Sequence, residues 1–314
     1  MRLTNKCLTT LFALTSIGCS GLNASGLVDG FNVVTLGKFS SQNGDLQGTL
    51  AVGGNLVLQN YSLNQSAPVP NTSGGGYDTV AAGNFSLAGG TLYGTAHSAS
   101  ASFTNATVCN GCSATGSSSP VDFTSVAQSA RATNSFLYHL TPTGTATTPY
   151  SALVLNAAGG ASLQVFSITS AELSNNAGID ITNLDPSATV VINVTDSGSH
   201  SATTSAAGLA INHNLVQRAG NVLFNFGSGI TDISLANSFY ASLLSPSAHI
   251  TGGYGAFNGD LLAGSYSGSN QFNLDGFSGT LPTPSCPTPE PSSIGMIVGA
   301  MFLGLGIKKF GRLR

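Results

Sequence analysis

The segment AVGGNLVL at residues 51–58 is matched by VAAGNFSL at residues 80–87, and this recurrence decides the expected fold class. Both segments place Gly, then Asn, then an apolar residue at the start of an alternating apolar run. Glycine accepts a positive φ, and Asn tolerates the same conformation while its side chain bonds to nearby backbone. Alternating apolar residues turn one face of a strand inward. The pattern therefore predicts a corner followed by a short strand.

The same triplet of Gly, Asn or Asp, and an apolar residue recurs at irregular intervals. It begins at Gly44, Gly54, Gly83, Gly220 and Gly259. Short strands joined by such corners fit either a β-solenoid or an antiparallel sandwich. A sandwich would favour Asn-Gly hairpins, which residues 43–44 and 258–259 permit. The irregular spacing and strands of about four to six residues favour a mainly β chain built as a β-solenoid, a β-helix-like stack with covered ends.

Residues 122–140 interrupt the β pattern. Asp122 is suited to cap a helix, apolar residues follow at helical spacing, and Pro142 closes the segment. We expect this one helix to flank the β-structure, with Arg131 and Tyr138 nearer solvent. Its buried face would comprise Phe123, Val126, Ala127, Ala130, Leu137 and Leu140.

Further strands are expected on both sides of the helix, with Ser245-Pro246-Ser247 as a break between two of them. They fall at residues 30–36, 150–155, 161–168, 188–194, 208–212, 221–226, 231–241, 248–251, 260–263 and 271–274.

The N-terminus has the three-part layout of a secretory signal peptide. Arg2 and Lys6 form a basic region, residues 8–17 form an apolar core, and small residues follow. We expect a signal peptide at residues 1–24, forming a signal helix, and an exported β domain at residues 25–280.

The C-terminus predicts a membrane anchor. A proline-rich linker at residues 281–291 precedes an apolar segment at 292–307 and a basic tail at 308–314. An apolar segment with a basic end inserts with that end in the cytoplasm, so residues 292–307 are expected to form a transmembrane helix. The segment is short for a bilayer, which suits a transient hold in the inner membrane.

This tail resembles the PEP-CTERM sorting signal of Gram-negative bacteria, which combines a Pro-Glu-Pro box, an apolar run and an Arg/Lys-rich end. In that family an exosortase processes the tail and passes the protein outward, often in species that make exopolysaccharide. A plain C-terminal anchor behind a proline-rich linker is the alternative. The sorting residues would be Pro289, Glu290, Pro291, Lys308, Lys309, Arg312 and Arg314.

Between its two ends the chain carries few charges. Three Lys and Arg stand against eleven Asp and Glu over residues 25–288, a net charge near −8. This excludes an electrostatic nucleic-acid surface, which needs clustered Lys and Arg. Charged residues are also far scarcer than in a typical domain, where they make up about a quarter of the residues.

Cys109 and Cys112 form a Cys-Asn-Gly-Cys motif in a Ser/Gly-rich loop. The sequence offers no second Cys pair to complete a zinc site. Because an exported protein meets an oxidising compartment, a local disulfide is the expected state of the pair.

Sequence motifs of enzyme chemistry are absent. The chain contains no His-Glu-x-x-His, Gly-x-Ser-x-Gly, phosphate-loop or EF-hand motif, and its five histidines are dispersed. Asp180 and Asp185 could flank a sugar as acid and base, but solvated loop aspartates are the simpler interpretation. We therefore expect no enzyme, no cofactor and no metal site.

Aromatic residues offer a binding surface instead, since a tyrosine ring stacks on a sugar while its hydroxyl bonds to it. The candidate contacts are Tyr61, Tyr77, Tyr93, Tyr254 and Tyr266, with Tyr240 beside them. An ice-binding role would need a flat, regular array of threonines on one face. No such register is evident among Thr91, Thr95, Thr104 and Thr107.

Three parts of the chain resemble the choice-of-anchor A domain family. They are residues 49–55, the helix at 123–140, and the stretch 222–259 with its VLFNF, LSPSA and FNG segments. That family takes its name from alternative C-terminal anchors, PEP-CTERM tails among them, and is regarded as adhesive. The resemblance covers most of residues 26–279, and its helix-plus-solenoid layout is also similar to ice-binding-type domains.

Three functional hypotheses follow. The first is an exported cell-surface or matrix protein of a Gram-negative envelope, an adhesin that binds exopolysaccharide or another surface ligand and is sorted by an exosortase. The second is a secreted carbohydrate-active enzyme on a β-solenoid, and the third is an ice-binding-type module. The scarcity of charge and of enzyme motifs favours the first.

Overall fold

A computed structural model describes the chain over residues 30–66, 76–108, 113–116, 118–205 and 219–283. Residues 21–282 form one compact unit. The remaining unit, residues 1–20 with 283–314, lies outside the described residues apart from Thr283.

Several predicted features also lie outside the described residues. They are the signal peptide, the Cys109–Cys112 motif, the strand at 208–212, the transmembrane helix and the PEP-CTERM tail. In the part of the chain that is described, no helix is long and apolar enough to span a membrane.

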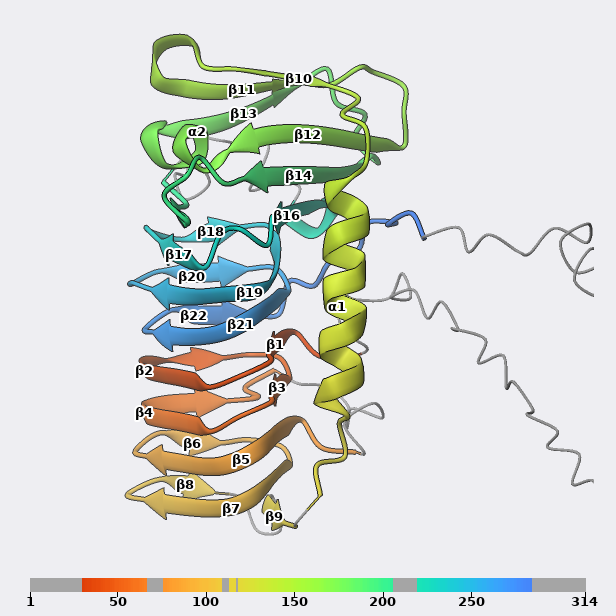
Figure 1. The fold of residues 1–314 in the computed structure, drawn as a ribbon. Coiled ribbons are helices and arrows are strands. Elements are labelled where there is room, and N and C mark those ends of the chain that lie inside the picture. The colour runs from red at the N-terminus through yellow and green to blue at the C-terminus, as the bar shows by residue number, and fades with distance from the viewer. Residues whose placement is uncertain (1–29, 67–75, 109–112, 117, 206–218, 284–314) are drawn as a thin grey trace, which may run out of the picture. The chain divides into compact units, whose positions relative to one another are not determined.

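Stacked parallel strands form a solenoid, as the corner-and-strand repeat predicts (Figure 1). The main sheet has 19 strands, and the pairings that build its rungs are parallel. Each complete rung turns two corners and so contributes strand segments to three faces, which we call the helix face, the hydroxyl face and the short-strand face.

The helix face is a ladder of strands, of which β1, β3 and β16 are fully buried. It consists of β1 (Val33–Thr35), β3 (Leu50–Val52), β9 (Ser113–Thr115), β12 (Leu163–Thr169), β14 (Thr189–Thr195), β16 (Val222–Phe226) and the first parts of β5 (Thr79–Ala88), β7 (Ala96–Thr104), β19 (Ser242–Gly252) and β21 (Leu261–Gly268).

The other two faces continue the same rungs. The hydroxyl face consists of β15 (Ser201–Thr203), β17 (Asp232–Leu235), the first parts of β2 (Phe39–Leu46) and β4 (Leu56–Leu63), and the second parts of β5, β7, β19 and β21. The short-strand face consists of β6 (Thr91–Leu92), β8 (Thr107–Val108), β18 (Phe239–Tyr240), β20 (Ala256–Asn258), β22 (Gln271–Asn273) and the ends of β2 and β4.

The chain enters the stack in its middle. Strand β1 pairs with β3 on one side and with β21 on the other, so Val33 lies between Leu50 and Leu261. From β1 the rungs run to β9 at one end, α1 then travels along the stack, and the chain returns from β12 to β22 (Figure 1). We call the junction of β1 and β2 with β21 and β22 the seam.

Helix α1 (Phe123–Tyr138) confirms the predicted helix. Asp122 caps it, accepting hydrogen bonds from the backbone N–H groups of Thr124 and Ser125 at 3.0 and 3.2 Å. As expected, Arg131 is exposed. Ala130 and Leu137 of α1 pack onto the outward side chains of the helix face, which are Val34, Ala51, Val80, Val191, Leu223, Leu244 and Leu262.

A buried asparagine network joins α1 to the sheet. The Asn134 carboxamide donates to Asn225 Oδ1 at 2.7 Å and to the Phe226 carbonyl at 2.8 Å. Asn225 in turn donates to Asn193 Oδ1 at 2.8 Å, and Asn193 donates to the Leu137 carbonyl at 2.8 Å. Because buried polar groups are costly unless paired, this network fixes the position of α1 along the stack.

The Gly-Asn/Asp triplets mark corners, as predicted, but not all of the same kind. A Cβ on Gly83 would lie 2.3 Å from Asn55 Oδ1 and 2.9 Å from the Gly54 carbonyl, so only glycine fits this stacked corner. Gly54 and Gly83 lead into the hydroxyl face, Gly259 leads into the helix face, and Gly44 leads into the short-strand face. The triplets therefore occur at irregular intervals.

Two local predictions are wrong. Strands are longer than about six residues where one continues through a corner: β5 has 10 residues and β19 has 11. The expected break at Ser245-Pro246-Ser247 is an irregularity inside β19, where the register shifts between Ser245 and His249. Proline is tolerated there because a bulge leaves its position without a ladder bond.

A second, three-stranded sheet and a short helix were not predicted, except that β11 (Ala152–Asn156) confirms the strand expected at residues 150–155. The sheet contains β10 (Thr145–Thr147), β11 and β13 (Gly178–Thr182) and lies at the β12 end of the stack (Figure 1). Helix α2 (Ser170–Asn175) begins with a capping box between Thr169 and Glu172. Two single turns complete the elements, η1 (Pro149–Ser151) and η3 (Ala219–Asn221).

The interior of the stack is an aromatic ladder that crosses the seam. Rings at the same register lie on each other, with centroids 5.1 Å apart for Phe239 and Phe257 and 5.3 Å apart for Phe257 and Phe272. Phe39 and Tyr266 stack at 4.8 Å across the seam itself. Such pairs add to the stabilisation from area burial.

Asp260 is the buried polar group of the seam. Its carboxylate accepts hydrogen bonds from the Phe277 N–H at 2.9 Å and from Asn32 Nδ2 at 3.2 Å. Burial raises the pKa of Asp260 above its ordinary value, and the two hydrogen bonds offset part of that effect. One carboxyl group thus joins the entry and exit segments of the solenoid.

We predict that N134A lowers the free energy of unfolding by about 2–4 kcal/mol, because Asn225 Oδ1 and the Phe226 carbonyl lose their buried donor. Denaturation in urea, followed by circular dichroism, measures the change. The matched control is R131A on the exposed side of α1, which should change stability by no more than about 0.5 kcal/mol. Equal effects of the two substitutions would contradict the role given to the network.

We further predict that Asp260 makes the fold less stable as pH rises from the acid range. The folded-state pKa exceeds the ordinary 3.8, so the unfolded chain releases this proton first and ionisation favours unfolding. The loss begins near pH 3.8 and is complete above the folded-state pKa. D260N removes the charge, so its stability relative to the wild type should grow through that interval and then level off. Parallel stability profiles for the two proteins between acid and neutral pH would contradict this assignment.

Candidate functional site

The outward positions of the hydroxyl face form one straight column along the stack, which we call the hydroxyl column. Strand pairing places its members in register across eight successive strands, and each is at least partly exposed. In order they are Thr203, Ser234, Thr251, Ser267, Ser40, Val57, Ser86 and Ser102. Every member except Val57 carries a hydroxyl, and paired strands are about 4.8 Å apart, so hydroxyls recur at that spacing.

The alternation of each strand explains why these side chains face outward. The residue before each column member points inward and is mostly apolar and buried, as with Ile233, Ile250 and Phe85. The burial of this inward residue thus fixes the outward orientation of the column residue that follows it. The corner glycines give these strands the same alternation of inward and outward side chains. Ser40, Ser86 and Ser267 each lie three residues after a corner glycine.

Most column hydroxyls have no partner within the described part of the chain. Ser267 is the exception: its Oγ lies 3.0 Å from His249 Nε2, while His249 Nδ1 lies 2.8 Å from Ser265 Oγ. The others, including Ser40 and Thr251, make no side-chain hydrogen bond to a described residue. They are therefore available to an external partner.

The four threonines considered for an ice-binding array do not belong to the hydroxyl column, which was not predicted from the sequence. These threonines lie apart: Thr95 bonds to Asp78 at 3.1 Å, while Thr91 and Thr107 pair on the short-strand face. The column is built mainly from serines, and it draws on both halves of the chain. For Ser40, Ser86 and Ser267 the sequence signal was their position three residues after a corner glycine, and the other hydroxyls of the column had no such signal.

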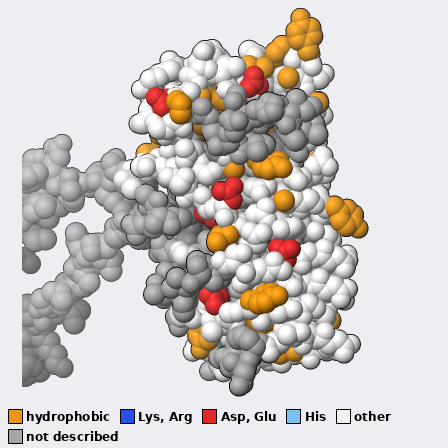
Figure 2. All heavy atoms as spheres, turned by 180° about the vertical axis from the view of Figure 1, so that it is seen from behind, with side chains coloured by type: hydrophobic (Ala, Val, Ile, Leu, Met, Phe, Trp, Pro, Cys, Tyr) orange, Lys and Arg blue, Asp and Glu red, His pale blue; other side chains and the backbone are white. Residues whose placement is uncertain are grey.

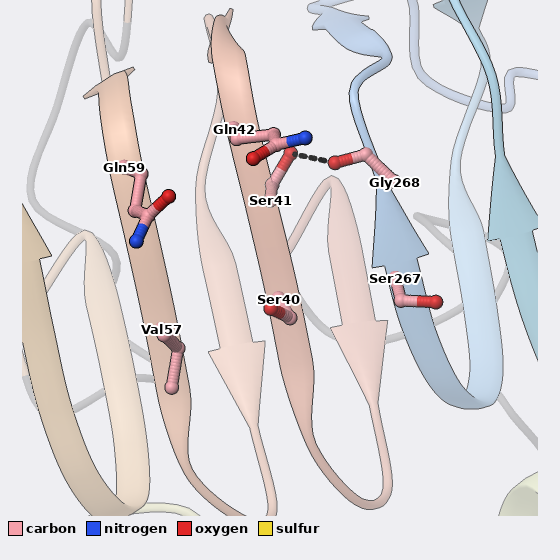
Figure 3. A pocket seen from close by; sticks show the side chains of 7 residues that line it. All are labelled: Ser40, Ser41, Gln42, Val57, Gln59, Ser267 and Gly268. Atoms are coloured by element: carbon pink, nitrogen blue, oxygen red, sulfur yellow. Dashed lines mark hydrogen bonds between the residues drawn. The ribbon is translucent and has the colours of Figure 1, made fainter.

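A shallow groove of about 320 Å³ crosses the hydroxyl face at the seam (Figure 3). It is lined by Ser40, Ser41 and Gln42 of β2, Val57 and Gln59 of β4, and Ser267 and Gly268 of β21. The groove exists because Ser267 and Gly268 of β21 are small, whereas Gln42 and Gln59, which lie beside the column on β2 and β4, have long side chains. No charged side chain lines it.

Two glutamines dominate the groove. Gln42 and Gln59 lie opposite each other on paired strands and both are exposed. Neither carboxamide makes a side-chain hydrogen bond to any described residue. Each offers a donor and an acceptor to solvent or to a ligand.

The floor of the groove is held rigidly from below. Ser41 Oγ donates to the Gly268 carbonyl at 3.1 Å (Figure 3). Beneath Gly268, the Tyr266 hydroxyl donates to Asn270 Oδ1 at 3.1 Å and accepts from the Asn270 N–H at 3.2 Å. A Cβ on Gly268 would come within 2.6 Å of that hydroxyl, so the close packing requires glycine.

Two of the five tyrosines expected to contact sugars are buried, which corrects that prediction. Tyr61 and Tyr266 are core residues; the Tyr61 hydroxyl donates to the Asp45 and Asn270 carbonyls at 2.8 and 3.1 Å. Burial raises the pKa of both phenols. They are accommodated inside because each large ring packs in the core while its hydroxyl forms hydrogen bonds there.

The remaining candidate tyrosines do not form one platform. Tyr77 is half-buried beside His97, with ring centroids 5.2 Å apart. Tyr93 and Tyr254 are exposed, at 46% and 83%, but they stand at different corners, after β6 and after β19 respectively. The sequence could not show this, because it does not reveal which tyrosine faces inward.

Charged groups are scattered over the described surface. Figure 2 shows the side opposite to the view of Figure 1, where neutral side chains predominate, acidic ones stand apart and no Lys or Arg is visible among the described residues. An Asp196–His200 contact at 2.7 Å is local to one turn. Over the described residues, no group of three or more His, Cys, Asp or Glu side chains is arranged to hold a metal ion.

Comparison with known proteins gives one family. The family model described as "Putative Ice-binding-like adhesive domain" matches residues 24–274. Among solved structures, the crystal structure of an ice binding protein from an Antarctic bacterium, Flavobacteriaceae, aligns with 82% of this chain and 81% of its own, at 12% sequence identity and a TM-score of 0.24. No curated protein matches the chain.

The burial of the tyrosines predicts their reactivity. Treatment of the folded protein with tetranitromethane should nitrate Tyr254 and Tyr93 and leave Tyr61 and Tyr266 unmodified, because the reagent must reach the ring. Peptide mass spectrometry locates the nitrated residues, and the urea-unfolded chain provides the control in which all four react. Early nitration of Tyr266 would contradict the closed floor of the groove.

Proposed function

The chain belongs to the family of ice-binding-like adhesive domains, and from that premise we propose that it is an exported adhesive module that holds a surface or matrix polymer through its hydroxyl face. The proposal is non-enzymatic. It makes the hydroxyl column the contact surface and assigns no catalytic residue.

The observation that carries the proposal is the hydroxyl column itself. Seven hydroxyls along one straight sheet face, most of them without partners in the described structure, offer many equivalent weak contacts. A neutral hydrogen bond contributes only about 1 kcal/mol net, but repeated contacts on one rigid body act together and raise the overall affinity. Adhesion to a repetitive partner needs this arrangement.

The positions of the two ends of the described unit support exposure of the hydroxyl face to a partner. Phe31 and Phe277 are buried in the cluster beneath α1, and Leu281 packs against it. Both ends of the described unit are thus attached on the helix face rather than on the hydroxyl face. We propose that the signal peptide exports the chain to the envelope or matrix, and that the PEP-CTERM tail of a choice-of-anchor A protein is sorted by an exosortase.

A second candidate function, ice binding, is favoured by the spacing of the column. Hydroxyls repeated at about 4.8 Å along a straight face form a regular array, and a regular array can contact the repeating positions of a crystalline lattice. The secreted-enzyme alternative has less support, since the lining of the groove contains hydroxyls and carboxamides but no carboxylate to act as acid or base.

We predict that S86K/T251K abolishes adhesion. Both lysines would project outward from the hydroxyl column and hold a partner away, and both positions are at least partly exposed, so the fold should tolerate the change. Beads coated with the full chain are placed on a film of the host's own exopolysaccharide, and the fraction retained under flow is measured. Retention should fall at least tenfold.

The matched control is Q128K/S135K, which adds the same charge to the exposed side of α1 and should retain wild-type adhesion. Equal retention of both double variants would refute the hydroxyl face as the contact surface. Thermal hysteresis of the same proteins distinguishes the second candidate: activity that S86K/T251K destroys, without adhesion by the wild type, would assign the column to ice.

A further inference from the structure

We propose that the groove at the seam is a binding site for a neutral polysaccharide chain, with Gln42 and Gln59 as its principal hydrogen-bonding residues. This inference rests on the proposed adhesive function and names the class of its ligand. It goes beyond the hydroxyl column, because the glutamines lie outside that column.

The lining of the groove matches the chemistry of an uncharged sugar. Its polar side chains are two carboxamides and the hydroxyls of Ser40, Ser41 and Ser267. Of these hydroxyls, Ser41 already bonds to the Gly268 carbonyl and Ser267 to His249. These groups both donate and accept, as the hydroxyls of a glycan do. Because neither carboxamide is engaged by a described residue, a ligand would not have to break an existing bond to reach them.

Charge selects against an acidic polymer. The groove carries no cation to pair with a uronate or sulfate group, and the chain between its two ends is strongly acidic in balance. An anionic chain would therefore meet repulsion without a compensating contact. A neutral chain avoids that cost.

The geometry suits a chain that lies along the stack. Gln59, Gln42 and Gly268 belong to three successive strands, β4, β2 and β21, which are about 4.8 Å apart. This step is similar to the length of one sugar unit in an extended glycan, so the groove offers contacts to about two or three units. Beyond it, the same polymer can continue along the hydroxyl column.

Because the groove lies across the seam, ligand binding there is expected to stabilise the folded protein. Its walls come from β2 and β21, whose residues Ser41 and Gly268 are paired across the seam although 227 positions separate them in the chain. A ligand that contacts both walls binds only the closed seam. It should therefore raise the melting temperature of the protein by mass action.

The test is affinity electrophoresis of the full chain in a polyoxyethylene detergent, which has no sugar headgroup to compete. Gels contain dextran, hydroxyethyl cellulose or galactomannan as neutral probes, or alginate as the anionic probe. We expect retardation by at least one neutral polymer and none by alginate. In Q42A/Q59A the apparent dissociation constant should rise at least tenfold, since two neutral hydrogen bonds are lost.

Two variants control the assignment. Q128A removes an exposed glutamine from α1 and should leave retardation unchanged. Y254A removes the most exposed tyrosine of the solenoid corners and should also leave it unchanged; loss in this variant alone would move the site to aromatic stacking and overturn the proposal. So would retardation that Q42A/Q59A retains, or retardation by alginate instead of the neutral polymers.

The outcomes separate this inference from the proposed function. If no neutral polymer retards the wild type while its beads still adhere under flow, the groove is not a polysaccharide site and the adhesive proposal stands. If the beads do not adhere but the neutral polymers are bound through Gln42 and Gln59, the adhesive proposal fails, while the assignment of the groove as a polysaccharide site stands. A rise in melting temperature with the retarding polymer, absent in Q42A/Q59A, would support binding across the seam.

Discussion

Parallel pairing of β1 between β3 and β21 is the constraint on which the rest of the structure depends. It places the first strand, β1, and the last rung, which contains β21, in the middle of the stack, so neither can cover an open end. The chain must then travel from one end of the solenoid to the other, and α1 covers the middle part of that distance along the helix face (Figure 1). The asparagine network beneath α1 and the buried Asp260 at the seam are consequences of this path, since each joins segments that are remote in sequence.

What could be predicted from the sequence was local. The triplet at Gly83 encodes a corner because only glycine fits against Gly54, and Asp122 encodes a helix start because its carboxylate satisfies two free N–H groups. Such signals depend on neighbours in the chain, and they gave the solenoid and α1. The three-stranded sheet after α1 could not be predicted as a sheet because its strands, such as β10 and β13, are short and carry no corner triplet.

The candidate site could not be predicted as a whole, because it is assembled across the seam. Ser40 and Ser267 are adjacent in the hydroxyl column only because β2 pairs with β21, and no local pattern announces that pairing. The prediction that Tyr61 and Tyr266 contact sugars failed for a related reason. Tyr61 and Tyr266 resemble surface aromatics in sequence, yet both rings fill the core near the seam. The Tyr61 hydroxyl donates to the Asp45 carbonyl, and the Tyr266 hydroxyl donates to Asn270 Oδ1 and accepts from the Asn270 N–H.

The same seam bears on the choice between a lattice and a polymer as the partner proposed for the hydroxyl face. A rigid lattice gains most from a column without interruption, because every contact must lie in one plane. Here the column is interrupted at Val57, and the groove opens beside it, between Gln59 and Gly268. A lattice would lose contacts in the middle of the face, where a flexible chain could bend into the groove and gain the two carboxamides. The interruption therefore favours a polymer, and it does so on geometry that is independent of the family to which the chain belongs.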